Sequence, residues 1–270
     1  MKNRTFLPLV LALLFANSYS LVVAQESREE KKTLDLDKDG TLYIDTYKGT
    51  IDIKTWDKPQ VDITARIVAD GGFWDHDEKA KVWDTEIRME GTSGNVSITT
   101  DYSRLRHHSW FFGIFGEDNG SLPLVHYTIM MPATAKLHIK DYKSDTKVSD
   151  LSASVDMETY KGSVEFRGIT GAVDLETYKG DVLVDFVKLT GDSRFKSEKG
   201  SIDIRLPNDV AFNLDTDFGR RVDFDSDFDA TVKTQHRHSD SEQASINGGG
   251  PTLRLQSEKG NFRLIKKATS

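Results

Sequence analysis

Apolar and polar residues alternate through most of this chain, which is the pattern of β-strands with one buried face and one solvated face. The alternation is clearest at 155–157, 164–166, 173–175, 182–184 and 202–204. We expect the apolar side chains of these segments to share one interior, lined by Val155, Met157, Val164, Phe166, Val173, Leu175, Val182, Val184, Ile202 and Ile204. A helical pattern is favoured only at 76–84, with Asp75 as its candidate N-cap.

A four-residue phrase separates these segments: Thr or Ser, then Tyr or Glu, then Lys and Gly. Copies lie at 46–49, 159–162, 177–180, 197–200 and 257–260, with weaker ones at 92–94 and 141–144. The glycines at 162, 180 and 200 are 18 and 20 residues apart, and Gly219 continues the step. A period of about 20 residues is typical of solenoids, in which each repeat buries its apolar face against the next repeat.

The sequence therefore predicts an all-β fold: a single β-solenoid, or parallel β-helix-like stack, of 18–20-residue turns. Each turn would consist of a strand, a tight corner, a second strand and a second corner, because glycine permits the positive φ that a corner needs. We expect at most one short helix, near 76–84, which would cover an open end of the stack. The repeat domain would span 34–266 after a flexible segment at 25–33, with an aromatic-rich insertion at 102–123.

The first 24 residues have the pattern of a secretory signal peptide, with Lys2 and Arg4 before an apolar run. Small residues precede the predicted cleavage between Ala24 and Gln25. The alternative, a membrane anchor, needs about 20 predominantly apolar residues, and polar residues at 17–20 interrupt this run. We therefore expect an exported protein of the periplasm or cell surface, without a transmembrane segment after signal removal.

Several motifs of the chain follow one another in the order known from one family. They are the phrase Ser/Thr-Tyr/Glu-Lys-Gly-x-Val/Ile-x-Val/Ile, the segments 127–132 (YTIMMP) and 206–208 (LPN), and the closing 247–251 (NGGGP). In these residues the chain resembles the bacterial putative-adhesin family of β-strand-repeat domains, over most of 34–265. The resemblance implies an exported, β-solenoid-like envelope domain of unknown function, and it offers no catalytic residues to transfer.

Stacked turns would also align the residues that flank each corner. Tyrosines would form one column and lysines the next: Tyr142, Tyr160 and Tyr178, and Lys143, Lys161, Lys179 and Lys199. Aromatic rings beside cations suit sugars or acidic polymers, so these residues are the candidate ligand-binding site. The alternative is structural: the side chains cover the strand beneath the corner, and Glu158, Glu176 and Glu198 offset the repulsion between lysines.

The insertion at 102–123 is the second candidate site. It carries Trp110, Phe111, Phe112 and Phe115 between glycines that argue against a regular helix or strand. An exposed aromatic loop is energetically unfavourable. It either folds back as a cap over the solenoid or contacts a partner protein or a membrane surface.

Composition and spacing exclude several classes of function. With 36 basic and 43 acidic residues, a net charge of −7, the chain lacks the positive excess that nucleic-acid binding requires. It has no cysteine, so disulfides and thiolate chemistry are excluded.

Asp35–Gly40 matches the start of a calcium loop, but Thr46 stands where the bidentate glutamate belongs, so a hairpin turn is favoured. The histidines at 107–108 and 236–238 lack zinc-pair spacing. We predict no metal site and no cofactor.

No nucleophile elbow, zinc-protease motif or phosphate loop is present in the sequence. The alternating acids Asp223, Asp225, Asp227 and Asp229 could bind a cation or raise one another's pKa, or they form a solvated face.

The favoured function is a non-enzymatic envelope protein that presents an extended surface to a protein or polysaccharide. The alternatives are a carbohydrate-active β-helix (lyase or hydrolase) and an envelope-stress or regulatory factor that binds another protein through 110–115.

Overall fold

The structure is a computed structural model that describes residues 26–70, 77–107, 121–230, 232–235 and 241–267. The helices of this part are α1 (Glu78–Asp84) and α2 (Ser103–His107). The strands are β1 (Ser27–Asp35), β2 (Thr41–Asp45), β3 (Lys48–Trp56), β4 (Gln60–Val68), β5 (Glu86–Thr92), β6 (Asn95–Asp101), β7 (Leu124–Pro132), β8 (Lys136–Ser149), β9 (Val155–Lys161), β10 (Val164–Ile169), β11 (Val173–Lys179), β12 (Val182–Phe186), β13 (Ser193–Pro207), β14 (Phe212–Ser226), β15 (Val232–Gln235), β16 (Ser241–Ile246) and β17 (Thr252–Lys267).

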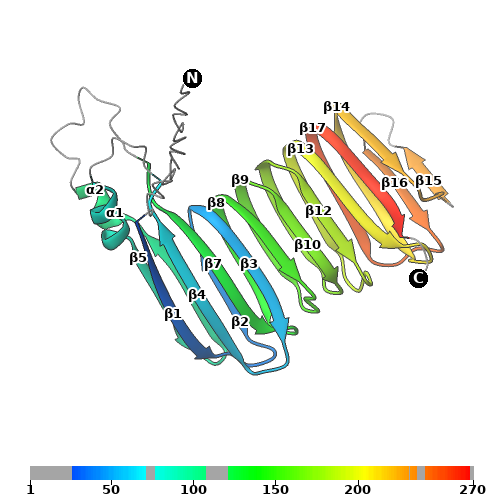
Figure 1. Cartoon of the computed structure of the whole chain (residues 1–270). Coiled ribbons are helices and arrows are strands. Elements are labelled where there is room, and N and C mark those ends of the chain that lie inside the picture. Colours follow the sequence, from blue (N-terminus) through cyan, green and yellow to red (C-terminus); the bar gives the residue numbers. More distant parts are fainter. Residues whose placement is uncertain (1–25, 71–76, 108–120, 231, 236–240, 268–270) are drawn as a thin grey trace, which may run out of the picture.

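The strands form two rows that enclose a narrow interior, so that the molecule is an elongated stack (Figure 1). The first row runs in the order β5–β6–β2–β8–β9–β11–β13–β17–β14–β16–β15. The second row runs β1–β4–β7–β3–β8–β10–β12–β13–β17–β14. The long strands β8, β13, β14 and β17 belong to both rows because each turns a corner between them.

The middle of the stack confirms the predicted solenoid. Strands β8 to β13 pair in parallel in both rows, and each turn supplies one strand to each row. All ten residues expected to line the interior are buried, with at most 3% of any side chain exposed. Burial of apolar side chains from successive turns in one interior is therefore the main stabilising interaction of the fold.

The corner glycines lie in register, as the repeat predicts. A Cβ placed on Gly162 would be 2.0 Å from the Ser144 carbonyl oxygen, and one on Gly180 would be 1.9 Å from the Gly162 oxygen. The same relation joins Gly200 to Gly180, at 2.0 Å, and Gly260 to Gly200, at 1.9 Å. The backbones of adjacent corners approach so closely that only glycine fits, which explains the recurrence of Lys-Gly in the sequence.

The order of the last turns differs from the expectation. Gly219 was expected to be the next corner after Gly200, but β17 lies between β13 and β14, so Gly200 pairs with Gly260 instead. Gly219 lies at a bulge of β14, beside Glu258. The chain leaves the stack after β13, forms the outermost turn with β14, and returns to insert β17. The spacing of glycines reports that turns exist but not the order in which they stack.

Three further expectations need correction. Residues 27–33, expected to be flexible, form most of β1, which pairs antiparallel with β4 and thereby closes one end of the second row. The turn at Asp37–Gly40 is not a hairpin, because β1 and β2 belong to different rows. A second short helix, α2, lies within the 102–123 insertion and was not expected. Its polar sequence SRLRH carries no apolar stripe that would have predicted it.

The predicted short helix is present. Helix α1 lies within the expected range, beside β1 at the N-terminal end of the stack (Figure 1). Asp77 occupies the N-cap position without a side-chain cap hydrogen bond, and Asp75 lies outside the described residues. At the other end, β14, β16 and β15 form an antiparallel sheet that continues the first row. Within the described residues, no helix is long and apolar enough to cross a membrane.

Candidate functional site

Four tyrosines form a continuous stack along one corner of the solenoid. The rings of Tyr47, Tyr142, Tyr160 and Tyr178 have successive centroid distances of 4.6, 4.9 and 4.6 Å and interplanar angles of 5–9°. These distances match the separation of adjacent strands, because each ring is carried by the next turn. The predicted column of Tyr142, Tyr160 and Tyr178 is therefore present, and Tyr47 extends it.

Lysines form the predicted second column beside the rings. Lys143 pairs in register with Lys161, Lys161 with Lys179, and Lys179 with Lys199. Lys161 Nζ lies 5.0 Å from the centroid of Tyr160, and Lys199 Nζ lies 5.4 Å from that of Tyr178. We call the surface formed by Tyr47, Tyr142, Tyr160, Tyr178, Lys143, Lys161 and Lys179 the tyrosine–lysine ridge.

The ridge lysines keep their charge available. Among the described residues, no ion pair includes Lys143, Lys161 or Lys179. Glu176, one of the acids expected to offset the lysines, pairs instead with Lys196 at 2.8 Å on the outer face of the first row. The lysines therefore form a row of positive charge, stabilised in part by the tyrosine rings.

The stack of rings restricts what the ridge can bind. Because each inner ring has its two faces covered by its neighbours, the tyrosines present their edges and hydroxyl groups to solvent. Tyr47 and Tyr142 are 38% and 39% exposed, and Tyr160 and Tyr178 are half-buried. Stacking of sugar rings on the tyrosine faces is therefore excluded along the inner part of the column. Hydroxyl and ammonium groups at a regular spacing suit a repeating ligand with acidic groups.

The N-terminal end of the ridge is closed by partly buried polar contacts. Lys48 continues the lysine column, but its Nζ donates to Asp70 Oδ2 at 2.7 Å and to Ser121 Oγ at 2.6 Å. Burial of Asp70 opposes ionisation, but the bonds from Lys48 and Ser121 outweigh it and lower the pKa of this carboxyl. Tyr102 packs edge-on against Tyr47, with 6.1 Å between centroids, and its hydroxyl donates to the Pro123 carbonyl.

A buried carboxylate lies beneath the ridge. Asp141, the residue before Tyr142, is 7% exposed and accepts hydrogen bonds from Ser144 N, Ser144 Oγ and Thr159 Oγ1, at 2.7, 2.6 and 2.9 Å. Burial raises the pKa of Asp141, against the lowering effect of these hydrogen bonds. The contacts between Asp141 and Thr159 tie two adjacent turns together at the corner, so they position the tyrosines above.

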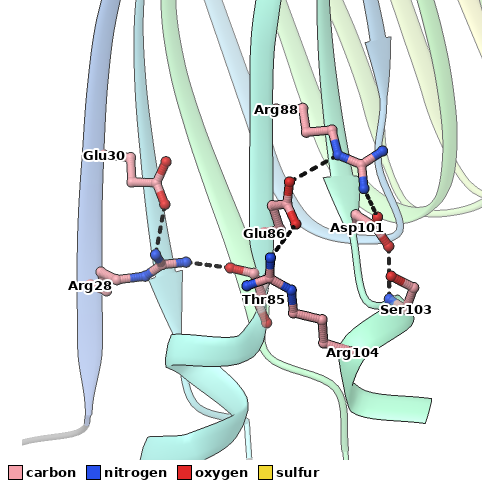
Figure 2. Close-up of polar contacts among 8 residues, drawn as sticks. All are labelled: Arg28, Glu30, Thr85, Glu86, Arg88, Asp101, Ser103 and Arg104. Carbon is pink, nitrogen blue, oxygen red and sulfur yellow. Dashed lines mark hydrogen bonds and ion pairs between the residues drawn. The ribbon is translucent and has the colours of Figure 1, made fainter. Parts of the chain in front are cut away.

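A polar network covers the N-terminal end of the stack (Figure 2). The guanidinium of Arg28 on β1 bonds to Glu30 at 2.8 Å and donates to the Thr85 carbonyl after α1. Arg88 bonds to Glu86 and Asp101, and the Ser103 N–H donates to Asp101 at 2.7 Å and lowers the pKa of that carboxyl. Each charge in this network already has a partner, so we assign it to stability rather than to ligand binding.

The four alternating acids predicted near the C-terminal end do not all lie on one strand. Asp223 and Asp225 lie on β14 and line an open groove of about 400 Å³ together with Arg263, whose Nε donates to Asp203 at 2.7 Å. Asp227 follows the strand and accepts the Lys266 N–H at 2.9 Å. In the described part of the chain, no group of three or more His, Asp or Glu side chains is arranged to hold a metal ion.

Other predicted sites lie outside the described residues. These are the cleavage site at Ala24 and Gln25, the aromatic residues Trp110, Phe111, Phe112 and Phe115, and the histidines at 236–238. Tyr47 is the ridge residue that the prediction missed. Its copy of the phrase is visible in the sequence, but nothing there shows that residues 47 and 142 lie on adjacent turns.

Two rows of stacked strands, joined at glycine corners, define the class of this protein as a β-solenoid-like domain. Residues 17–264 match the family model described as Toastrack DUF4097, so the chain belongs to that family. No curated protein matches the sequence. The predicted relationship to adhesin-like β-strand-repeat domains is thus confirmed at the level of family and fold.

Solved structures that align with this chain come from bacteria. A putative cell adhesion protein of Clostridium sporogenes aligns over 90% of this chain and 100% of its own, with 11% identity and a TM-score of 0.50. A putative adhesin of Bacteroides fragilis aligns over 89% of this chain and 97% of its own, with 10% identity and a TM-score of 0.30. A putative lipid binding protein of Parabacteroides distasonis covers 87% and 96%, with 10% identity and a TM-score of 0.26.

Proposed function

We propose that this protein is an exported, non-enzymatic envelope protein that binds an acidic polymer along its tyrosine–lysine ridge. The observation that carries the proposal is the regular ridge itself: four stacked tyrosines with 4.6–4.9 Å between rings, beside lysines that form no ion pair among the described residues. A ligand that repeats along its length would meet the same hydroxyl and ammonium groups at each turn.

Electrostatics favours an acidic ligand over a neutral one. In water, two opposite unit charges 4 Å apart attract by about 1 kcal/mol, so several equivalent contacts are needed for useful affinity. A linear polyanion supplies them together, since its successive groups are linked at a high effective concentration. Lys143 and Lys179 are exposed, so a chain that passes over the ridge can reach both.

The test is titration with acidic and neutral oligosaccharides. Oligogalacturonate and a neutral galacto-oligosaccharide of the same length are titrated into the wild type and into the triple variant Lys143→Glu, Lys161→Glu, Lys179→Glu. A second triple variant changes exposed lysines elsewhere, Lys136, Lys147 and Lys188, to glutamate and so has the same net charge. We expect the ridge variant to lose affinity for oligogalacturonate by about tenfold or more, and the control variant to lose much less.

The same experiment separates the alternatives. Equal losses in the two triple variants would mean that net charge rather than the ridge determines binding, and the proposal would be wrong. Cleavage of the polymer that disappears in Asp225→Asn would favour the carbohydrate-active alternative. Binding of another protein that is lost on deletion of residues 109–116 would favour the regulatory alternative.

Export is a separate part of the proposal. The apolar run after Lys2 and Arg4, and the small residues before Gln25, support secretion with cleavage after Ala24. Removal of Lys2 and Arg4 would change the net charge from −7 to −9. Expression of the full chain in a bacterial host, followed by fractionation and N-terminal sequencing, should give an envelope-fraction protein that begins at Gln25. A protein that stays in the cytoplasm and still begins with Met1 would contradict export.

A further inference from the structure

The second row of the stack ends in a strand with an open edge. β14 pairs with β17 along most of its length, but β16 covers the other edge of β14 only from Phe212 to Asp217. Among the described strands, none pairs with the outer edge of Val222–Ser226. β14 lies at the far end of the stack from β1 (Figure 1).

The other ends of the two rows are protected. At the N-terminal end, Lys32 Nζ of β1 donates to the Met89 carbonyl of β5 at 2.6 Å, and Arg28 donates to the Thr85 carbonyl. Side chains of β1, the last strand of the second row, thus bond to backbone carbonyls at the end of the first row. The first row ends in the short hairpin of β15 and β16. An unprotected strand edge is a template for pairing with another strand, and β14 has such an edge.

The backbone direction shows which groups are free. The Asp227 N–H donates to the Leu264 carbonyl of β17 at 2.9 Å. Because successive residues of a strand point their N–H and C=O groups to opposite sides, Asp223 and Asp225 also point toward β17. The N–H and C=O groups of Val222, Phe224 and Ser226 therefore point to the open edge.

The side chains of this segment divide into an apolar side and a charged side. Phe224 lies in register with Phe262, which is buried in the interior, yet Phe224 is 37% exposed because no further turn among the described residues covers it. Arg221, Asp223 and Asp225 face outward and are exposed. The edge therefore combines free hydrogen-bonding groups, an uncovered apolar side and a charged side with both signs.

We propose that a second copy of this chain pairs with this edge, antiparallel, with the two-fold axis through Val222. In that register Val222 faces Val222 of the second copy and exchanges both backbone hydrogen bonds with it. Arg221 faces Asp223 of the second copy, and by symmetry the pair occurs twice. The two Val222 side chains lie side by side, and Phe224 lies opposite Arg220 of the second copy, whose stem and guanidinium group cover the ring.

The neighbouring registers are unfavourable. A two-fold axis at Asp223 places two aspartates opposite each other, and one at Arg221 places two arginines opposite each other. An axis at Phe224 places Asp223 opposite Asp225. The axes at Asp223 and Phe224 also place Arg221 opposite an aspartate, Asp225 or Asp227, but each of them opposes two aspartates as well. Like charges directly opposite one another destabilise a strand pair. Only the axis at Val222 pairs opposite charges without opposing like charges, so the charge pattern selects it. Because the pairing is antiparallel, the two ridges would lie at opposite edges of the joined row, and a dimer would offer two separate binding surfaces.

A charge-swap experiment tests the dimer on the protein from Gln25 onward. Sedimentation velocity over a range of concentrations should show a monomer–dimer equilibrium for the wild type. Arg221→Asp and Asp223→Arg should each weaken the dimer by about tenfold or more, because each turns two attractive pairs into two repulsive ones. The double variant with both changes restores opposite charges and should dimerise like the wild type.

The side chains of Arg221 and Asp223 are exposed, so the variants should fold, which circular dichroism verifies. A wild type that stays monomeric at several hundred micromolar overturns the proposal. So does a double variant that remains as weak as the single variants, because the association would then not depend on this register. Oligogalacturonate binding by the single variants is measured separately, so failure of the dimer is distinguishable from failure of the ridge.

Discussion

At the scale of single residues, the corner glycines determine how closely the turns approach. Gly162 has a φ of +127°, which L-residues with a side chain rarely adopt, and its α-carbon faces the Ser144 carbonyl. Gly180 has the same close approach to Gly162. Repetition of Lys-Gly in the sequence therefore reflects a steric requirement of stacking, and it was the most informative signal in the chain.

Gly162→Ala should destabilise the protein by more than about 2 kcal/mol, because it adds both backbone strain and a contact with the Ser144 carbonyl that no rotamer relieves. Urea unfolding measures the loss. Gly94→Ala is the matched control, since a Cβ there has no neighbour within 4 Å. Equal stability of the two variants would show that the corner is not as tightly stacked as described.

Asp141 makes stability depend on pH. Its pKa is raised by burial, so the folded state binds the proton more tightly than the unfolded chain, and the free energy of unfolding falls as the pH rises above the ordinary value of about 3.9. Asp141→Asn removes this ionisation. We expect the stability of the wild type relative to this variant to decrease from pH 4 to pH 7.

Urea unfolding at several pH values tests the effect of Asp141. Asp209→Asn, at an exposed position in the turn after β13, serves as the control. A difference between wild type and Asp141→Asn that stays constant with pH, or that changes in the opposite direction, would show that Asp141 does not titrate as its burial requires.

At the scale of elements, the first strand acts as a seal. β1 pairs with β4 on one side, and on the other its basic side chains reach the carbonyls of Thr85, just before β5, and of Met89 in β5. This role is hard to predict, because the segment SREEKKTLD is highly charged and resembles a flexible leader. Its charged side chains bond to backbone carbonyls and to neighbouring acids, a role that a hydrophobic pattern cannot reveal.

Lys32→Met should leave the backbone edge of β5 at Met89 unprotected while keeping most of the apolar stem of the side chain. The Met89 carbonyl would lose its bond from Lys32 Nζ, which we expect to reduce stability by about 1–2 kcal/mol and to increase self-association. Lys31→Met is the control, because Lys31 is exposed and pairs only with Glu29 among the described ion pairs. Light scattering and urea unfolding measure the two effects. Identical behaviour of the two variants would contradict the seal.

At the scale of the whole molecule, the fold class and the interior could be predicted, and the order of the turns could not. Alternation identifies which residues of a strand face inward, so Val164 and Phe166 were placed correctly. The insertion of β17 between β13 and β14 depends on a pairing between residues 60 positions apart, Ser193 with Leu253. Local spacing carries no information about such a pairing, so Gly219 was misplaced.

The ridge, too, could be predicted only where it depends on neighbouring repeats in the sequence. Its central tyrosines and lysines follow directly from the repeat, since their turns are consecutive in sequence. Tyr47 and the closing contacts of Lys48 with Asp70 and Ser121 come from segments far apart in the chain. Its extent could therefore be established only from the structure.

The central claim, that turns stack in this register, is tested most directly by pairs of introduced cysteines, since the chain has none of its own. A disulfide needs Cα atoms within about 7 Å, a condition met by adjacent strands, which are about 4.8 Å apart, and not by strands two steps apart. Asp156→Cys with Asp174→Cys, and Arg194→Cys with Arg254→Cys, join adjacent strands. Asp174→Cys with Arg254→Cys joins strands two steps apart.

Mild oxidation followed by mass spectrometry measures the extent of disulfide formation in each double variant. The stack predicts intramolecular disulfides in both adjacent pairs, including the pair separated by 60 residues in sequence, and none in the third pair. A disulfide between residues 174 and 254, with none between 194 and 254, would contradict the order of turns on which the fold and the ridge depend.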